Sequence, residues 1–462
     1  MATADTYGLD VIPGFRGELI RQDHPDYDEA RKVWNGLIDR RPSLIARCTG
    51  PPDVAAAVRL GRQRQMTVAV RGGGHNVAGT AVCDGGLVID LSPMKRISID
   101  PVACTAKAEA GLLWGEFDRE CQRYGLATPA GIVSHTGIAG LTVGGGIGHL
   151  MRQYGLTCDN VRSMQVVTSD GDLVRTSSAD EPELFWAVRG GGSNFGIVTS
   201  FEYRLHRVGP SVLAGLVLYR ADRAVEVVRM YRDFVAEAPR DFGSVVSFRT
   251  APTLAWIPQE LHGQPVVALT VCYTGPPAEG ERLLQPLRRF GPPAADLVRR
   301  QPYVDLQALF DATVPHGWHY YWKSVSLPPL TDAAIETLAT VAWRKRSPRS
   351  FIMLFHKGGA VRDLSEGAMA YSGRDAEHEL NINGVWTAED SRQEDSDWVR
   401  KTFEQMSPHS TGRAYINFLG DEGRQRVRAA YGAAKYQRLV QLKRRYDPDN
   451  FFRLNQNINP SD

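Results

Sequence analysis

Three glycine-rich segments in the first half of the chain constrain its fold most strongly. The first is Arg71-Gly72-Gly73-Gly74-His75-Asn76, the second runs from Gly131 to Gly148, and the third runs from Arg189 to Gly196. Each is bordered by apolar residues typical of buried strands or helices. An internal glycine costs about 0.5–1 kcal/mol relative to alanine. Three such runs therefore indicate that the backbone approaches a bulky, phosphorylated ligand.

The first run follows a short apolar strand, residues 67–71, and ends at His75. Glycine reaches positive φ without a steric penalty, so consecutive glycines can turn their N–H groups toward an anion. An imidazole beside such a cradle is a neutral nucleophile near pH 7. The pattern favours a nucleotide cofactor that is gripped and covalently attached. A glycine-rich turn with an incidental histidine is the alternative.

Composition narrows the class of protein. The chain has 462 residues, a length that favours two domains, and its 43% hydrophobic and 23% charged residues are typical of a globular protein. A net charge of +2 gives no reason to expect binding to nucleic acid or to a membrane surface. No apolar run approaches the ~20 residues of a membrane span. Residues 1–13 do not resemble a signal peptide, so we expect a cytoplasmic protein.

The six cysteines show no paired or tight spacing, which argues against a zinc site and a disulfide framework. His316 and His319 are close in sequence, but without further ligands nearby we expect no metal.

Local sequence patterns predict two regions that differ in the composition of their helices and strands. Up to residue 208 we expect helices at 51–64, 112–124 and 181–188, and strands at 44–48, 67–71, 87–91, 105–109, 161–168, 172–176 and 197–205. Beyond it, charged helices alternate with apolar strands: helices at 224–238, 278–290, 331–344 and 423–446, and strands at 266–273, 319–326, 351–356 and 379–386.

The two standard nucleotide motifs are missing. A dinucleotide-binding strand–turn–helix needs G-x-G-x-x-G, and the run from Gly144 to His149 has histidine where the last glycine is required. No G-x-x-x-x-G-K-[ST] motif occurs either.

The glycine runs and the closing segment from Phe452 to Ile458 together resemble the FAD-linked oxidases of the vanillyl-alcohol oxidase and p-cresol methylhydroxylase superfamily, within it the berberine-bridge-enzyme-like branch. The resemblance extends over about residues 30–460. It implies an α+β fold with a PCMH-type FAD-binding domain (1–208), an antiparallel-sheet substrate domain flanked by helices (209–412), and a C-terminal segment (413–462) that returns to the FAD domain.

The resemblance also implies roles for individual residues. His75 is the position that bonds to the 8α-methyl carbon of the flavin. The other positions expected to contact FAD are Arg71, Gly72, Gly73, Gly74, Asn76, Gly137, Gly140, Gly144, Gly145, Gly196, Ile197, Val198, Asn417 and Asn457.

Two departures from the family pattern matter. Many relatives carry a second flavin-bonding residue, a cysteine, where this chain has Val133, so we expect attachment through His75 only. Many also have the motif Tyr-x-Asn-Tyr, in which the last position is Phe418 in this chain. Tyr415 is therefore the better candidate for an acid/base group or a substrate clamp. The alternative is a buried tyrosine whose hydroxyl is satisfied by a backbone carbonyl.

The Val133-Ser134-His135-Thr136-Gly137 segment looks like that of bacterial secondary-metabolism members, among them the enterocin-pathway flavoenzyme. By this resemblance, Thr136 and Leu141 lie near flavin N5 and influence how oxygen reaches it.

In the second region, the strand from Trp318 to Lys323 places alternate side chains on opposite faces. We expect one face to be core and the other, with Tyr321 and Lys323, to line a substrate cavity. His356 and Glu379 are polar residues at strand positions and are weaker candidates.

The sequence therefore favours an FAD-dependent oxidase that oxidises an alcohol, amine or ketone carbon of a small or polyketide-type natural-product intermediate with O2. The alternatives are a sugar or hydroxynicotine-type amine oxidase, a dehydrogenase with another electron acceptor, and a flavin-binding protein without turnover. We expect a monomer or homodimer whose partners are a small-molecule substrate and O2.

Overall fold

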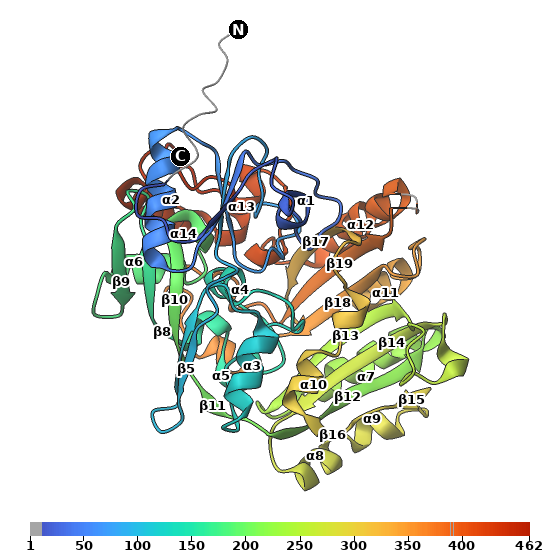
Figure 1. Ribbon diagram of the computed structural model, residues 1–462. Coiled ribbons are helices and arrows are strands. Elements are labelled where there is room, and N and C mark those ends of the chain that lie inside the picture. The colour runs from blue at the N-terminus through green and yellow to red at the C-terminus, as the bar shows by residue number, and fades with distance from the viewer. Residues whose placement is uncertain (1–11, 389, 391) are drawn as a thin grey trace.

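A computed structural model describes residues 12–388, 390 and 392–462 (Figure 1). Its first sheet has the strand order β1-β2-β4-β3. In this sheet β2 and β3 both run parallel to the central β4, and α2 connects them. The predicted strand–helix–strand start is therefore present, with β4 inserted between its strands. The bounds are β1 Glu18–Ile20, β2 Leu44–Arg47, α2 Pro51–Gln63, β3 Val68–Arg71 and β4 Leu87–Asp90.

A second, antiparallel sheet has the order β5-β6-β10-β8-β9. The strands predicted at 161–168 and 172–176 are β8 and β9, which pair with each other antiparallel. The elements of this part are β5 Ile97–Asp100, β6 Thr105–Glu109, α3 Trp114–Gln122, α4 Ile138–Gly144, β8 Val161–Val167, β9 Leu173–Ser177, α6 Pro182–Val188 and β10 Ile197–Arg204.

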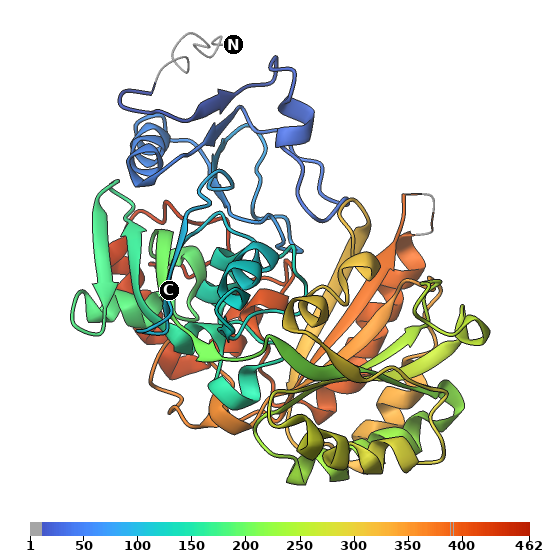
Figure 2. The same cartoon turned by 60° about the horizontal axis from the view of Figure 1, so that its bottom comes forward.

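The middle of the chain forms a large antiparallel sheet with the order β15-β12-β14-β13-β18-β19-β17, and β16 also pairs with β12. Helices α7, α11 and α12 cover one face of it (Figure 2). The bounds are β12 Ser211–Arg220, α7 Ala224–Glu237, β13 Phe242–Thr250, β14 Pro265–Tyr273, β15 Ala295–Asp296, β16 Arg299–Pro302, β17 His319–Leu327, α11 Asp332–Val341, β18 Phe351–His356, β19 His378–Trp386 and α12 Arg392–Met406.

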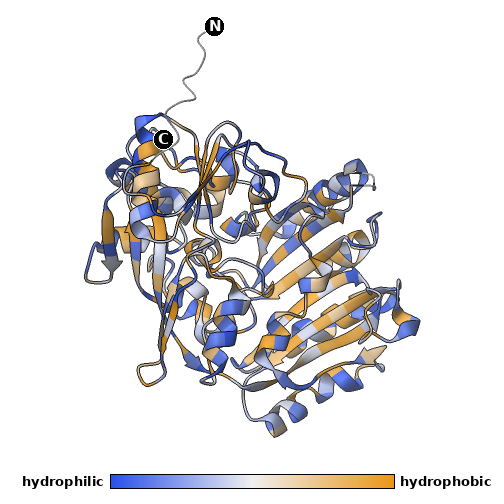
Figure 3. Ribbon diagram, in the orientation of Figure 1, coloured by the Kyte–Doolittle hydropathy of each residue, from blue (hydrophilic) through white to orange (hydrophobic). Residues whose placement is uncertain are grey.

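Side chains alternate between two cores along these strands. Ile352 and Leu354 of β18 pack with the covering helices, whereas Phe351, Met353 and Phe355 pack with residues from the first half of the chain. In Figure 3 the central strands of this sheet contain many hydrophobic residues, which are coloured orange. One face of the large sheet is thus available to meet the glycine-rich half.

Two predicted helices are each divided in two. The one expected at 278–290 becomes α8 Pro277–Leu283 and α9 Gln285–Arg289, because Pro286 has no N–H to continue the helix. The one expected at 423–446 becomes α13 Arg424–Tyr431 and α14 Ala433–Tyr446, separated by Gly432 at φ +76°. Glycine tolerates that left-handed backbone, which a continuous helix cannot contain.

The end of the chain packs against the first half. Arg438 on α14 forms an ion pair with Glu183 at 2.9 Å, and the buried Lys443 donates to the carbonyl of Asn194 at 2.8 Å. Shorter elements complete the fold: α1 Tyr27–Ala30, β7 Leu126–Ala127, α5 Met151–Tyr154, β11 His206–Arg207 and α10 Tyr303–Gln307. Of the helices that the structure describes, none combines the length and apolar character needed to cross a bilayer.

Candidate active site

A cavity of about 270 Å³ lies where the glycine runs, the large sheet and the C-terminal segment meet. Its lining includes Trp34, Gly72, Gly73, Gly74, His75, Asn76, Val133, Thr136, Gly137, Gly140, Leu141, Gly192, Trp322, Phe351, Met353, Phe355, Asn381, Asn383, Tyr415, Asn417, Phe418, Asn455 and Gln456. The structure therefore brings together most of the residues predicted for a cofactor, together with a face of the large sheet.

His75 is held in one orientation at this cavity. Its ring stacks on Trp34 with centroids 4.3 Å apart and planes 17° from parallel. Its Nε2 forms a 2.8 Å hydrogen bond with Nδ1 of His135. Burial, with smaller contributions from His135 and His316, lowers the pKa of His75 well below its ordinary value. The imidazole is therefore neutral near pH 7, as a nucleophile must be.

His316 completes a group of three imidazoles with His75 and His135, whose nitrogen atoms all lie within 4.8 Å of one another. His319 lies elsewhere, with its ring edge-on to Trp386. Three imidazoles suit zinc or copper. Nε2 of His75 and Nδ1 of His135 are 2.8 Å apart, so one of these two nitrogens donates a hydrogen bond to the other and the pair can share a proton.

The glycines serve two different purposes. A Cβ added at Gly140 meets nothing within 4 Å, and Gly192 is almost as open, so both leave room in the cavity for a ligand. Gly73 and Gly137 instead pack against each other, since a Cβ on either lies 2.4 Å from the other's backbone N. Part of the glycine content is thus required by loop packing and part by the cavity.

Several residues predicted to contact the cofactor lie outside the cavity lining. A Cβ at Gly144 would lie 2.0 Å from Oδ1 of Asn417, and one at Gly145 would lie 2.6 Å from the ring of Tyr371. Gly196 packs on Val166. Three others are also outside the lining: Ile197 and Val198, which are buried in β10, and Asn457, whose Oδ1 is buried and has no partner in the described part of the chain.

Arg71 has a structural partner. It lies in β3 and forms a buried ion pair with Asp90 at 2.7 Å. This pair links the end of β3 to β4 and so holds the start of the first glycine run in place.

Tyr415 lies at the cavity with its phenol oxygen accepting two hydrogen bonds. The donors are the N–H of Gly146 at 2.7 Å and Nδ2 of Asn417 at 2.8 Å. The same Nδ2 also donates to the carbonyl of Leu141 at 3.1 Å, which fixes the orientation of the amide. Burial raises the pKa of Tyr415 although both donors act in the opposite direction. Tyr415 is therefore a neutral phenol whose own hydrogen can be donated to a ligand in the cavity.

The large sheet contributes a face that sequence reasoning missed. Cross-strand register places Phe351 of β18 beside Asn383 of β19, and Met353 beside Asn381. Asn381 is 3% exposed, and its Nδ2 has no partner among the described residues. Nε1 of Trp322 is buried and unpaired in the same way. The alternation Phe351, Met353, Phe355 was visible in the sequence, but nothing there identified which face meets a ligand.

The expectation for β17 needs a correction. Tyr321 and Lys323 point away from the cavity, toward the α12 side of the sheet. Lys323 forms an ion pair with Glu422, and Tyr321 lies under Arg400 of α12. Trp322 is the residue of this strand that lines the cavity. Successive side chains of a strand point to opposite faces, so Tyr321 and Lys323 lie on the face that the helices cover.

Glu379 and His356 lie behind the cavity face rather than in it. The buried Glu379 carboxylate accepts hydrogen bonds from Ser324, from Ser326 at 2.6 Å and from the backbone N–H of Tyr415 at 3.0 Å. His356 pairs with Glu377 at 2.8 Å. Glu379 thus braces the segment that presents Tyr415.

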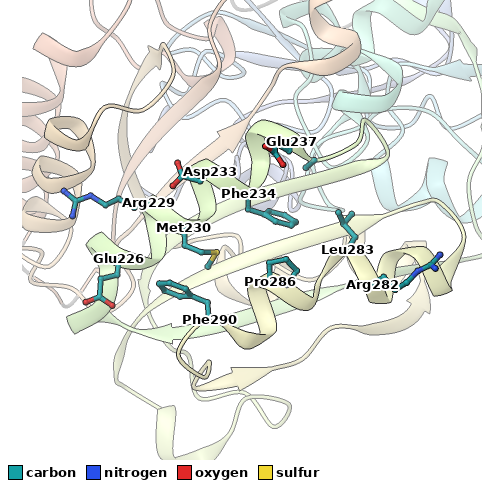
Figure 4. Close-up of a pocket in the computed structure, with 11 residues that line it drawn as sticks. Glu226, Arg229, Met230, Asp233, Phe234, Glu237, Arg282, Leu283, Pro286 and Phe290 are labelled. Atoms are coloured by element: carbon teal, nitrogen blue, oxygen red, sulfur yellow. The ribbon is translucent and has the colours of Figure 1, made fainter.

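A separate hollow lies between α7 and the α8–α9 pair, lined by Met230, Phe234 and Phe290 with charged residues around them (Figure 4). It shares no residue with the cavity at His75 and belongs to the helical face of the large sheet.

Fold and cavity together define a protein with an enclosed cavity between a glycine-rich half and an antiparallel sheet. A family model described as "FAD binding domain" matches residues 42–177, and one described as "Berberine and berberine like" matches residues 414–459. An FAD-linked oxidoreductase of Dictyostelium discoideum is 31% identical over 449 residues, covering 96% of this chain and 95% of that protein.

(R)-6-hydroxynicotine oxidase of Paenarthrobacter nicotinovorans is 30% identical over 461 residues, covering 96% of this chain and 97% of that enzyme. The crystal structure of 6-hydroxy-D-nicotine oxidase from Arthrobacter nicotinovorans has a TM-score of 0.84 at 28% identity, covering 96% of this chain and 98% of that one. The chain belongs to the berberine-bridge-enzyme-like family of FAD-dependent oxidoreductases. The expected family and the α+β two-domain fold are confirmed.

The residues around the cavity fit FAD. Gly140 and Gly192 leave the backbone open to a bulky group. At the cavity wall, Oδ1 of Asn455 is a buried acceptor to which none of the described residues donates. His75 and Tyr415 both line this cavity, together with side chains of the large sheet. When bound, FAD supplies the redox chemistry, and the protein supplies binding and orientation.

Proposed function

We propose that the protein is an oxidase that carries FAD bonded to His75 alone and passes electrons from a neutral, flat organic substrate to O2. The observation that carries this proposal is the neutral imidazole of His75 at the cavity wall, fixed by Trp34 and His135. Val133, at the position of the second flavin link in many relatives, also lines the cavity and has no atom that can bond to a flavin carbon.

The cavity wall supports the substrate class. On the large sheet it is formed by Trp322, Phe351, Met353 and Phe355, with the amides of Asn381 and Asn383 among them. None of the described lining residues is an Asp, Glu, Lys or Arg. An apolar wall with isolated polar groups favours aromatic or polyketide-type molecules over oligosaccharides, whose many hydroxyls each need a partner.

Three hydrogen-bond donors would orient such a substrate: Nδ2 of Asn381, Nε1 of Trp322 and the phenol of Tyr415. They complement carbonyl or phenolic oxygens. We propose that Tyr415 holds the substrate oxygen and exchanges a proton with it as the adjacent carbon is oxidised. The two donors on its oxygen would stabilise the phenolate if it forms.

Thr136 and Leu141 line the cavity, as do Tyr415 and Asn417. We propose that they limit the space through which O2 approaches, as the family resemblance implies. The contact between Asn417 and the Leu141 carbonyl keeps Leu141 in place.

A second candidate is an amine oxidase of the hydroxynicotine type, favoured by the 30% identity to (R)-6-hydroxynicotine oxidase over nearly the whole chain. The cavity wall would accept a neutral heteroaromatic amine. A dehydrogenase with another electron acceptor is distinguished from both only by its reaction with O2.

The experiment is an anaerobic titration of the purified protein with a panel of phenolic polyketides, heteroaromatic amines and oligosaccharides, followed by admission of air. The proposal predicts flavin bleaching by a phenolic polyketide, recovery within seconds in air, and stoichiometric hydrogen peroxide. Bleaching by amines alone would establish the second candidate. Bleaching without recovery in air would contradict the oxidase proposal.

The six cysteines are all free thiols, which supports the reducing cytoplasm as the location. We also propose that the domains divide at residues 208/209 and 412/413 and that the protein is a monomer or a homodimer.

A further inference from the structure

We propose that His135 is the positioning residue for flavin attachment: it accepts the Nε2 proton of His75, so that Nδ1 of His75 can bond to the flavin. This inference rests on the covalent link at His75 proposed above. It concerns how the link is made, a step that precedes any turnover of substrate.

The geometry determines which nitrogen of His75 reacts. Nε2 is engaged with Nδ1 of His135 at 2.8 Å, whereas Nδ1 of His75 has no hydrogen-bond partner in the described part of the chain. The stack on Trp34 prevents the ring from turning, and Trp34 is itself held by its Nε1 bond to the Val314 carbonyl at 2.9 Å. In the tautomer that leaves a lone pair on Nδ1, the hydrogen is on Nε2 and is donated to His135.

His135 has a route by which to pass this proton on. Its Nε2 is buried without a hydrogen-bond partner among the residues that the structure describes, and it lies in the group with His316, whose ring centroid is 5.1 Å from that of His135. His316 is exposed to solvent. A proton gained at Nδ1 of His135 can therefore leave from its Nε2 toward His316 and water.

The loop that carries His316 is fastened to the loop that carries His135. Asp311 accepts the backbone N–H of Ser134 at 2.9 Å and the Ser134 hydroxyl at 2.5 Å. His316 comes from the segment before β17 and His135 from the second glycine run, so this contact keeps the two imidazoles together. The carboxylate of Asp311 also favours the protonated form of His135, against the effect of burial on its pKa.

The step balances as follows. One C–H bond of the flavin 8α-methyl and the N–H bond of His75 are lost, and one C–N bond forms between the methyl carbon and Nδ1. Two protons leave, the imidazole proton by way of His135. The two electrons remain on the flavin until O2 accepts them, with two protons, to form hydrogen peroxide.

The test uses full-length protein with His135→Ala, with His319→Ala as the matched control because that histidine is in the adjacent strand and outside the group of three. Each protein is incubated aerobically with excess FAD. Attachment is followed by intact mass and by the flavin that stays with acid-precipitated protein. Absorbance and thermal melting show whether FAD binds to folded protein before attachment.

We expect His135→Ala to bind FAD but to attach it at least about a hundredfold more slowly, the usual contribution of a general base. Added imidazole should restore the rate, since it can fill the vacated space and accept the proton. His319→Ala should behave like the wild type. If His135→Ala does not fold, His135→Asn keeps an acceptor atom but cannot relay the proton, and the same slow attachment is expected.

Attachment at the wild-type rate in either His135 variant would overturn the inference and leave the proposed function intact. Slow attachment that imidazole does not accelerate would also overturn it, because His135 would then have only a structural role. A wild-type protein without covalent flavin would instead refute the link at His75 in the proposed function.

Discussion

At the scale of single residues, two neighbouring buried tyrosines differ in what their hydroxyls do. Tyr415 accepts hydrogen bonds from Gly146 and Asn417, whereas the hydroxyl of Tyr371 is buried and has no partner among the residues described. Their rings lie 6.1 Å apart, so they share one environment. The comparison isolates the effect of the hydrogen bonds.

We predict that Tyr415→Phe lowers the free energy of unfolding by about 1–3 kcal/mol, because the buried N–H of Gly146 loses its acceptor and the Asn417 amide keeps only the Leu141 carbonyl. It should also slow turnover of any substrate identified by flavin bleaching. Tyr371→Phe should cost little or nothing. Urea unfolding of both variants at equal flavin content tests this, and equal losses in the two would contradict it.

How much of the site could be predicted depends on the residue. Positions within the glycine motifs, such as His75 and Gly140, line the cavity and could be assigned to the site because the family resemblance extends to single residues of these motifs. Trp34 and Asn381 could not, because only tertiary packing brings them to the cavity. Tyr321 and Lys323 were assigned to the wrong face, since alternation gives two faces but not which one the helices cover.

At the scale of elements, α4 shows that glycines close in sequence serve different ends. Gly140 faces the open cavity, while Gly144 is pressed against the side chain of Asn417. The helix thus touches the cofactor site with one turn and the C-terminal segment with the next.

We predict that Gly140→Ala melts within a few degrees of the wild type but retains less FAD, because the methyl group enters the cavity. Gly144→Ala should unfold more easily, because its Cβ overlaps Asn417 and overpacking costs about 1–3 kcal/mol. Thermal melting and flavin-to-protein absorbance ratios measure both effects. The reverse ranking in stability would show that the two glycines have been misassigned.

Most helices and strands could be predicted from the periodicity of apolar residues. The points at which two helices are interrupted, and some of the strands, could not. The strand β12 was not predicted, although its run of buried apolar residues is long, because Gly215 interrupts the pattern. Gly432 and Pro286 divide helices that the apolar pattern alone treats as continuous. The order of strands in the large sheet depends on non-local pairing, which no local pattern contains.

At the scale of the whole molecule, buried neutral histidines link stability to pH. Burial lowers the pKa of His149 to about 4 and that of His378 to about 3. The side-chain nitrogens of both have no partner within the described structure. The unfolded chain binds a proton at each near pH 6.5, whereas the folded protein does not.

The unfolded state therefore holds more protons between about pH 6.5 and 4, and the free energy of unfolding should fall as the pH falls through this range, by up to about 1.4 kcal/mol per pH unit for each histidine. Urea unfolding at pH 7 and pH 5 measures the slope. Replacement of His149 by Leu should flatten it, and an unchanged slope in that variant would contradict this origin.

The central claim is that one neutral imidazole, His75, holds FAD covalently and that no second residue does. The most direct test is to denature wild-type protein and His75→Ala in acid and to record whether the yellow chromophore precipitates with the polypeptide. If His75 is the single attachment residue, colour stays with the wild type and is washed out of the variant. Colour lost from both, or retained by both, would contradict it.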